Sequence, residues 1–411
     1  MEDLLFLTHR IPYPPNKGDK IRSFNLLKQL VKDYRVHLGT FIDDPVDWQY
    51  VAELDKLCGE TCYEGLNPLF AKLRSTRGFL TGEALTVPYY QNARMRNWVD
   101  ATLREHAVKR VLVFSSAMCQ YLLQDSTSHI RRVVDFVDID SDKWQQYSES
   151  LKWPMSWLYK RESKTLLTFE RRVARQFDAS VFVSQAESDM FKKLAPESAS
   201  RVSYIENGVD ADYFSQNQRL QNPYAPEERV LVFTGAMDYW ANADAVVWFA
   251  QTVFPKILQR VPDARFYIVG GRPGEGVKKL GAGAGVHVTG SVKDIRPYLA
   301  HAQAAVAPLR IARGVQNKVL EAMAMEKPVL ATSAALDGIV GCPALETLRA
   351  DEPEEMVNKA VDLLTTDRGE ALGKAGRSCI TEHYDWARNL SRIERLLENT
   401  SDSSSTGAEN R

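Results

Sequence analysis

The sequence contains no apolar run of about 18 residues, the length that a helix needs to cross a bilayer. It also lacks a basic N-terminal stretch followed by a long apolar one, so we expect neither a transmembrane helix nor a signal peptide. Net charge is equally scarce: 52 Lys and Arg face 53 Asp and Glu, which leaves −1 and argues against nucleic acid as a partner. Together these absences favour a cytoplasmic protein.

Cysteine is rare and scattered in the 411 residues. An odd number of widely spaced cysteines argues against a disulfide framework and for a reducing compartment. Only the first two are close together, and no second Cys or His pair completes a zinc site, so we interpret them as buried thiols. The seven histidines show no metal-ligand spacing either, and neither a metal nor a cofactor is expected. The five cysteines are Cys58, Cys62, Cys119, Cys342 and Cys379.

Short apolar runs alternate with longer helical patterns along the whole chain. Runs rich in Val, Ile and Leu that are separated by helices indicate parallel sheets covered on both faces. The predicted strands are 4–7, 36–42, 111–114, 133–137, 179–183, 202–205, 230–234, 265–269, 286–289, 304–307 and 329–331. The predicted helices include 21–32, 95–105, 186–194, 243–258 and 318–325.

This alternation occurs twice, with a cluster of turn and linker residues between Asn207 and Glu228. We therefore predict two doubly wound α/β domains, 1–208 and 209–384, that face each other across a cleft. A helix near 385–399 is expected to pack back onto the first domain, and the polar tail 400–411 is expected to be disordered. In such sheets, ligands bind beyond the carboxyl ends of the strands, so the loops there are the candidate sites.

The loop after the first predicted strand is the first candidate. Gly18 lets the backbone approach a ligand closely, and Asp19 stands beside it. The helix that follows offers free N–H groups to an anion. A rigid Pro-rich connector explains the same residues equally well.

The segment 310–324 is the second candidate, and it follows the strand that ends near Pro308. Gly314 precedes a helix whose first-turn amides can hold a phosphate, and Arg313 and Lys318 add positive charge there. Glu321 lies one turn beyond Lys318, where an acceptor-only carboxylate suits the two hydroxyls of a ribose. The alternative is a surface ion pair worth less than about 1 kcal/mol. We favour the ligand site.

Several carboxylates follow the strand 133–137. Such a cluster at a strand end suggests acid/base work or acceptor binding. Asp138 and Asp140 also form an Asp-x-Asp triplet, but this triplet is common by chance and metal binding is not expected. Asp140 or Ser141 serves equally well as a helix N-cap.

The stretch 152–175 mixes aromatic residues with lysines and arginines. This composition suits peripheral contact with a membrane surface. A helix with one face in the core and a charged outer face is the interpretation that we favour.

Four segments resemble motifs of one known family. Residues 321–324 with Lys327–Val329, 205–210 with Phe214, 233–237 with Asn242 and Asp244, and 288–292 carry the resemblance. They are similar to the nucleotide-sugar signature, the interdomain junction, the start of the donor domain and the base-lining loop of family 4 glycosyltransferases of the GT-B fold. The opening 10–15 and the run 310–323 resemble the subgroup associated with the PEP-CTERM/exosortase A system, which implies bacterial exopolysaccharide synthesis.

The resemblance implies a nucleoside diphosphate sugar as donor, bound by the second domain, and retention of the anomeric configuration. It places the acceptor, lipid-linked or saccharide, at the first domain near Gly18, Asp19 and Asp138. In the resulting hypothesis, Arg313, Lys318 and Asp138 act in catalysis. The expected donor-binding residues are Gly235, Met237, Val292, Gly314, Val315, Gln316, Asn317 and Glu321.

The chain also departs from the family pattern. The family's first glutamate is replaced by Arg313, so the resemblance does not imply a sugar. The usual Arg and Lys are missing from 235–244, and Arg313 with Lys318 is expected to supply that charge. The family usually has two adjacent glycines in its N-terminal loop, where this chain has Gly18 and Asp19. Asp138 occupies the position at which many relatives have a histidine.

We therefore predict a metal-independent hexosyltransferase in the cytoplasm or at the inner face of the cytoplasmic membrane. A sugar-nucleotide epimerase or hydrolase of the same fold is the alternative within enzymes. A non-catalytic nucleotide-sugar-binding partner is the alternative from another class, and Arg313 in place of the glutamate is the feature that favours it.

Overall fold

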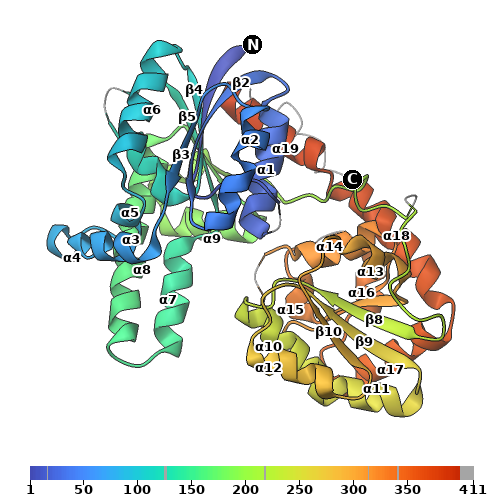
Figure 1. Ribbon diagram of the computed structural model, residues 1–411. Coiled ribbons are helices and arrows are strands. Elements are labelled where there is room, and N and C mark those ends of the chain that lie inside the picture. Colours follow the sequence, from blue (N-terminus) through green and yellow to red (C-terminus); the bar gives the residue numbers. More distant parts are fainter. Residues whose placement is uncertain (16, 125–126, 217–218, 313, 340–341, 399–411) are drawn as a thin grey trace, which may run out of the picture. The chain divides into compact units, whose positions relative to one another are not determined.

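The computed structural model describes residues 1–15, 17–124, 127–216, 219–312, 314–339 and 342–398 (Figure 1). The chain divides into two compact units. Unit 1 comprises Met1–Glu206 and the C-terminal residues from Leu390 on, and unit 2 comprises Asn207–Asn389. The tail 400–411 lies outside the described residues.

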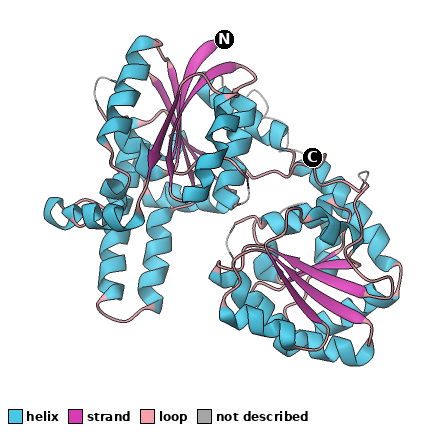
Figure 2. Cartoon of the chain, viewed as in Figure 1, coloured by secondary structure: helices cyan, strands magenta, loops and turns pink. Residues whose placement is uncertain are grey.

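Unit 1 is built on a seven-stranded parallel sheet in the order β3-β2-β1-β4-β5-β6-β7. Its inner strands are continuous runs of buried apolar side chains, because helices cover both faces of the sheet (Figure 2). The strands are β1 (Glu2–Thr8), β2 (Tyr34–Ile42), β3 (Thr61–Gly65), β4 (Arg110–Phe114), β5 (Arg131–Val137), β6 (Ala179–Phe182) and β7 (Val202–Tyr204).

The helices of unit 1 include a long antiparallel pair, α7 and α8, that extends beyond the carboxyl edge of the sheet (Figure 1). The α-helices are α1 (Gly18–Leu30), α2 (Val51–Asp55), α3 (Pro68–Ser75), α4 (Arg77–Thr81), α5 (Thr86–Tyr89), α6 (Ala93–Glu105), α7 (Asp140–Ser150), α8 (Met155–Gln176) and α9 (Gln185–Leu194). The 3-10 helices are η1 (Pro45–Tyr50), η2 (Ser116–Tyr121) and η4 (Pro196–Arg201).

Unit 2 holds a five-stranded parallel sheet in the order β10-β9-β8-β11-β12. The strands are β8 (Arg229–Thr234), β9 (Ala264–Val269), β10 (Val286–Gly290), β11 (Ala304–Ala307) and β12 (Val329–Ala331). The helices are α10 (Trp240–Trp248), the π-helix η5 (Phe249–Val253), α11 (Phe254–Arg260), α12 (Glu275–Lys278), the 3-10 helix η6 (Lys279–Ala282), α13 (Arg296–His301), α14 (Asn317–Ala324), α15 (Ser333–Leu336), α16 (Pro343–Leu348), α17 (Pro353–Thr365) and α18 (Arg368–His383).

The last helix, α19 (Trp386–Glu398), belongs to both units. Its buried residues Leu390, Ile393 and Leu397 recur at helical spacing. The same end of the helix contacts unit 1 through polar groups: Gln29 Nε2 donates to Glu394 Oε1 at 2.7 Å, and Arg131 Nε donates to the carbonyl of Leu396 at 2.9 Å. The helix thus completes the covering of the unit 1 sheet.

Each predicted strand is present, and one strand was not predicted. β3 pairs only with β2 at the edge of the sheet, and its residues are mostly half-buried. Its sequence, Thr-Cys-Tyr-Glu-Gly, therefore lacks the apolar run by which the inner strands are recognised. The predicted helix 243–258 is in fact α10, η5 and α11 in succession.

The cysteine spacing argued against a disulfide framework, yet one disulfide is present. Cys342 and Cys379 are joined, with their Cα atoms 5.7 Å apart and their sequence positions 37 apart. The packing of α16 against α18 brings them together, which cysteine spacing cannot reveal. Cys58 and Cys62, which were expected to be buried thiols, are only half-buried, and Cys119 is buried.

The favoured interpretation of 152–175 holds for only part of this stretch. From Glu162 onward, α8 turns a buried face toward the sheet. Its start does not, because Trp153 is 80% exposed and Trp157 is 56% exposed. Among the described residues, no helix combines the length and the apolar composition needed to cross a bilayer.

Candidate functional site

The order of the strands in unit 2 reverses between β8 and β11. Loops that leave neighbouring parallel strands at such a switch point diverge to opposite faces of the sheet, and ligands bind there. The loop after β8 begins at Gly235, and the loop after β11 leads into α14. The second candidate segment of the sequence therefore starts at the switch point of this sheet.

Glycines bring the loops after β8, β9 and β10 together. Gly235 has φ of +156°, and its N–H donates to the carbonyl of Val269 at 3.0 Å. A Cβ atom on Gly270 would lie 1.7 Å from the carbonyl oxygen of Gly235, so only glycine fits there. Met237 is buried, and its N–H donates to Gly271 at 2.9 Å.

Val292 follows β10 at the same edge and is partly buried against the core of unit 2. Gly235, Met237 and Val292, three of the expected donor-binding residues, thus lie on the loops that follow β8 and β10, the strands on either side of β9.

The start of α14 offers free backbone donors. Gln316 is the N-cap residue, but its side chain does not cap the helix. The N–H of Val319 donates to the carbonyl of Gln316 at 2.9 Å, so the N–H groups of Asn317 and Lys318 remain at the helix end. Gly314, with φ of +62°, turns the chain into this position. A backbone with these properties suits an anion.

Two charged side chains of α14 are partly buried next to this helix end. Lys318 Nζ lies 5.5 Å from the ring centroid of Phe233 in β8 and 3.4 Å from Gln316 Oε1. Burial lowers the pKa of Lys318 to about 8, although the charge of Glu321 opposes this shift. Burial likewise raises the pKa of Glu321 to about 7, opposed by Lys318. Burial therefore disfavours the charged forms of both Lys318 and Glu321. Such shifts are typical of a ligand-binding site.

Arg313 lies outside the described residues, so its position is not stated. The neighbouring Arg310 forms a two-pronged ion pair with Asp244 of α10, with Nε 3.0 Å from Oδ2 and Nη2 2.5 Å from Oδ1. The charge of Arg310 is thus compensated within unit 2. Among the described cations of the segment 310–324, Lys318 is therefore the one that remains for contact with a ligand.

The strand order in unit 1 reverses between β1 and β4, and the first candidate loop follows β1. Gly18 is exposed and begins α1, and no atom lies within 4 Å of the place of a Cβ. Asp19 accepts a hydrogen bond from Arg10 Nη1 at 2.6 Å, and His9 Nε2 lies 3.5 Å from the same oxygen. Burial alone would raise the pKa of Asp19, but the hydrogen bond with His9 and the charge of Arg10 hold it well below its usual range.

Sequence reasoning missed the partners of Asp19. Arg10 also donates to Asp43, with Nε 3.0 Å from Oδ2 and Nη2 2.8 Å from Oδ2. The imidazole of His9 stacks on Phe114 of β4 at 5.8 Å. The signal in the sequence was the position of these residues directly after strands, since His9 follows β1 and Asp43 follows β2.

The carboxylates after β5 serve different purposes. Asp135 is fully buried and accepts a hydrogen bond from Arg22 Nε at 2.7 Å, so it is part of the core. Asp138 and Asp140 flank the ammonium of Lys143, at 2.8 Å and 3.4 Å. The predicted acid/base cluster therefore reduces to a half-exposed pair around one lysine.

Neither Asp140 nor Ser141 caps α7 with its own side chain. Glu170 of α8 does so instead, with Oε1 accepting from the Ser141 N–H at 3.1 Å and Oε2 from Ser141 Oγ at 2.5 Å. Burial raises the pKa of Glu170 to about 8. This contact ties α7 to α8 across 29 residues of sequence.

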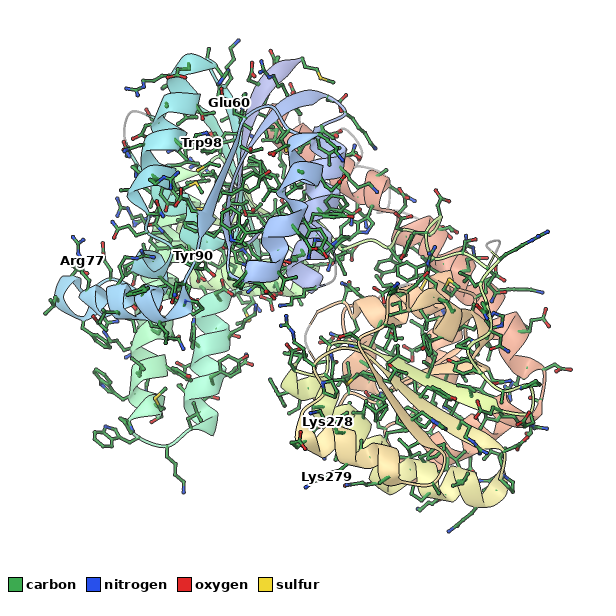
Figure 3. All side chains as sticks on the ribbon, in the orientation of Figure 1. Glu60, Arg77, Tyr90, Trp98, Lys278 and Lys279 are labelled. Atoms are coloured by element: carbon green, nitrogen blue, oxygen red, sulfur yellow. A yellow bond between two sulfur atoms is a disulfide. The ribbon has the colours of Figure 1, made fainter. Side chains whose placement is uncertain are left out.

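One group of residue types that bind metals does occur in the described part of unit 1. Ligating atoms of Asp3, His37 and His106 lie within 4.8 Å of one another. His37 Nδ1 accepts from the Glu60 N–H at 3.1 Å, so Nε2 carries the proton donated to Asp3 at 2.8 Å. Both ring nitrogens of His37 are thus used. Its ring stacks on that of His106 with centroids 4.3 Å apart, and His106 Nε2 lies 3.0 Å from Glu60 Oε1 (Glu60 is labelled in Figure 3).

Comparison with known proteins finds a protein family that matches most of unit 2. Residues 228–366 match the family described as glycosyl transferases group 1. A GDP-mannose-dependent alpha-(1-6)-phosphatidylinositol monomannoside mannosyltransferase of Mycobacterium tuberculosis is 30% identical over 244 residues, which are 53% of this chain and 60% of the relative. A phosphatidyl-myo-inositol mannosyltransferase of the same species is 27% identical over 252 residues, 58% of this chain and 64% of the relative. The chain thus matches less than two thirds of the length of these relatives.

Solved structures resemble the chain over nearly its full length. Anabaena Alr3699/HepE in complex with UDP and glucose matches with a TM-score of 0.67 and 15% identity, over 97% of this chain and all of that one. WaaG, a glycosyltransferase involved in lipopolysaccharide biosynthesis, matches with a TM-score of 0.66 and 15% identity, over 96% and 99%. This chain therefore has the GT-B fold, and its segment 228–366 carries the sequence of glycosyl transferases group 1.

Proposed function

We propose that this protein is a glycosyltransferase that moves a hexose from a nucleoside diphosphate sugar to an acceptor hydroxyl. One observation carries the proposal: the partly buried Lys318 and Glu321 lie in the first turns of α14, at the switch point of the sheet. They do so within the segment that matches glycosyl transferases group 1. A cation, a free helix end and a carboxylate in one place suit a diphosphate joined to a ribose.

In this proposal, the bond between the anomeric carbon and the diphosphate oxygen breaks, and the electron pair stays on the diphosphate. The acceptor oxygen forms the new bond to the anomeric carbon, and its proton passes to an oxygen of the departing diphosphate. Lys318, Arg313 and the N–H groups of α14 offset the charge that develops on the diphosphate. We propose that these cations take the place of a metal ion, and that the configuration of the sugar is retained.

We assign the acceptor to unit 1, near Gly18, Asp19 and Asp138. Lys143 Nζ lies 2.8 Å from Asp138 Oδ2, and the oxygens of this part-exposed carboxylate suit hydrogen bonds from sugar hydroxyls. We propose a lipid-linked or saccharide acceptor in bacterial exopolysaccharide or glycoconjugate synthesis, in line with the PEP-CTERM/exosortase resemblance. The setting that we propose is the cytoplasm, with peripheral contact of 152–175 at the inner face of the membrane.

The test is a transfer assay with purified full-length protein. The relatives' names mention GDP-mannose and UDP, so GDP-mannose and UDP-glucose are the first donors to supply. With lipid-linked saccharide acceptors, mass spectrometry should find one added hexose on the acceptor and one nucleoside diphosphate released for each. If donor alone yields free sugar or an epimer as fast as donor with acceptor, a hydrolase or epimerase is present instead.

Affinity for the sugar nucleotide is expected to peak between about pH 7 and pH 8. Above about pH 8, Lys318 loses the proton that makes it attractive to the diphosphate, and below about pH 7, Glu321 gains a proton and no longer only accepts hydrogen bonds. Calorimetry with the intact sugar nucleotide checks this, because its diphosphate diester does not titrate in that range. In Glu321→Gln, the fall on the acid side should disappear. An affinity that does not change between about pH 6 and pH 9 would contradict the assignment.

A further inference from the structure

Exposed apolar side chains are concentrated in one part of unit 1. Of the 18 exposed large hydrophobic residues in the described chain, ten lie between Leu69 and Trp157, on α3, α4 and the α7–α8 hairpin. The most exposed are Leu80 at 90%, Trp153 at 80% and Leu69 at 78%. We refer to residues 68–82 and 151–161 together as the docking surface.

The two segments of the docking surface are held together by specific contacts. The rings of Phe79 and Trp157 stack nearly in parallel, with centroids 6.5 Å apart. Arg161 of α8 lies 4.9 Å over the ring of Phe79, and its Nη2 donates to the carbonyl of Gly78 at 2.6 Å. Glu162 adds hydrogen bonds from the backbone N–H groups of Leu85 at 2.7 Å and Thr86 at 2.9 Å. The apolar side chains are thus exposed on a fixed framework.

The docking surface is also positively charged. Residues 68–82 contain Lys72, Arg74 and Arg77 and no acidic residue. Residues 151–161 contain Lys152, Lys160 and Arg161 and again no acidic residue. These six cations stand out in a protein whose net charge is −1. Segments that bind anionic lipid surfaces typically combine exposed Trp and Leu side chains with lysines and arginines.

A pocket of about 590 Å³ adjoins this surface. Four arginines line it, together with Asn92 and Tyr121: Arg74, Arg77, Arg94 and Arg96. Arg74 Nε donates to the carbonyl of Pro88 at 2.7 Å, and Arg96 Nη1 donates to that of Tyr121 at 2.6 Å. Arg77 projects from α4 (Figure 3).

Carbonyl oxygens hold two of the guanidinium groups of the pocket in place without neutralising their charge. Among the described residues, Glu64 is the carboxylate that pairs with the pocket, at 3.3 Å from Arg94 Nε. The pocket therefore carries excess positive charge, with Arg74 and Arg96 held in place and Arg77 and Arg94 exposed, which suits the phosphate of a lipid headgroup.

We propose that the docking surface binds the face of a bilayer that contains anionic phospholipids, and that the four-arginine pocket binds a headgroup phosphate. Leu80, Trp153 and their apolar neighbours enter the headgroup region while the cations meet the lipid phosphates. The proposal extends the contact of 152–175 to a second segment and a pocket. It uses no residue of the donor site, so it stands or fails separately from sugar transfer.

Flotation of the full-length protein with vesicles tests the proposal. Binding to phosphatidylcholine vesicles that contain about a third phosphatidylglycerol should exceed binding to pure phosphatidylcholine by at least about tenfold and should weaken with salt. Leu80→Ala with Trp153→Ala should reduce binding by at least about tenfold. Val46→Ala with Trp48→Ala is the matched control, because it removes the same kinds of exposed side chain from η1. It should bind as the unmodified protein does.

The pocket is tested with Arg77→Glu and Arg94→Glu, which should abolish the preference for phosphatidylglycerol. Inorganic phosphate is the competitor: weak competition is expected, whereas full displacement at low millimolar phosphate would show a site for free phosphate. Equal binding to both vesicle types, or no binding while sugar nucleotide still binds, would overturn the proposal. So would a dimer that Leu80→Ala with Trp153→Ala disrupts, because the occupant would then be a second copy of the chain.

Discussion

Lys318→Ala should lower the turnover of sugar transfer by at least about a hundredfold, with a smaller effect on binding of the sugar nucleotide. The reason is the place of this ammonium, in the first turn of α14 and next to the free end of the helix. Negative charge on the diphosphate grows as the glycosidic bond breaks, so a fixed cation there stabilises the transition state more than the bound donor. Steady-state kinetics with the best donor and acceptor gives the measurement.

The controls separate the role of this lysine from a general loss of charge. Lys278→Ala removes a lysine of α12 that pairs with Glu275 in the same unit, and it should leave turnover unchanged (Figure 3). Lys318→Arg keeps the charge but changes its shape, and it should recover part of the activity. If Lys318→Ala transfers sugar at nearly the normal rate, Lys318 does not act on the leaving group.

Asp135→Ala should destabilise unit 1 by about 3–5 kcal/mol, because it leaves the guanidinium of Arg22 buried without its carboxylate. The two side chains are 0% and 1% exposed, and they join β5 to α1. The carboxylate also accepts a hydrogen bond from the Val137 N–H at 3.1 Å, which would lose its acceptor. Hydrogen–deuterium exchange of the β5 amides measures the loss in unit 1 separately from unit 2.

Asp138→Ala is the matched control for that experiment. It breaks the pair with Lys143, whose side chains are 28% and 37% exposed, and it should cost less than about 1 kcal/mol. Similar protection of β5 in both variants would show that burial of the Arg22 pair does not decide the stability of unit 1.

The sheets could be predicted because their strands are buried on both faces. Such strands are runs of Val, Ile and Leu, and short helical patterns lie between them. The edge strand β3 was not predicted because its half-buried positions hold Thr, Cys and Tyr, and its one buried position holds a glutamate. The exposure of the start of α8 was not predicted for the opposite reason. Trp is a residue type that usually packs in a core, but the side chains of Trp153 and Trp157 are exposed.

That the segment 310–324 follows a strand of the second sheet was predictable from glycine, charge and strand ends alone, and its role in donor binding stays a prediction. Its electrostatics were not, because the shifted pKa values of Lys318 and Glu321 depend on burial within the unit. The partner of Asp135 was beyond sequence reasoning too, since Arg22 lies 113 residues away. Lys143 lies only five residues from Asp138, so this pair could have been predicted from the sequence.

Because α19 begins in unit 2 and ends in unit 1, the two units are expected to differ in when they can fold. Unit 2 is one uninterrupted stretch whose ends meet: the Val209 N–H donates to Tyr384 at 2.8 Å, and Asn389 Nδ2 donates to the carbonyl of Asn207 at 3.3 Å. Unit 1, by contrast, is complete only after the ribosome has added Leu390, Ile393 and Leu397, the buried residues of its last helix. We therefore expect the later-made unit to reach its native state first during synthesis, with the earlier one waiting for its final helix.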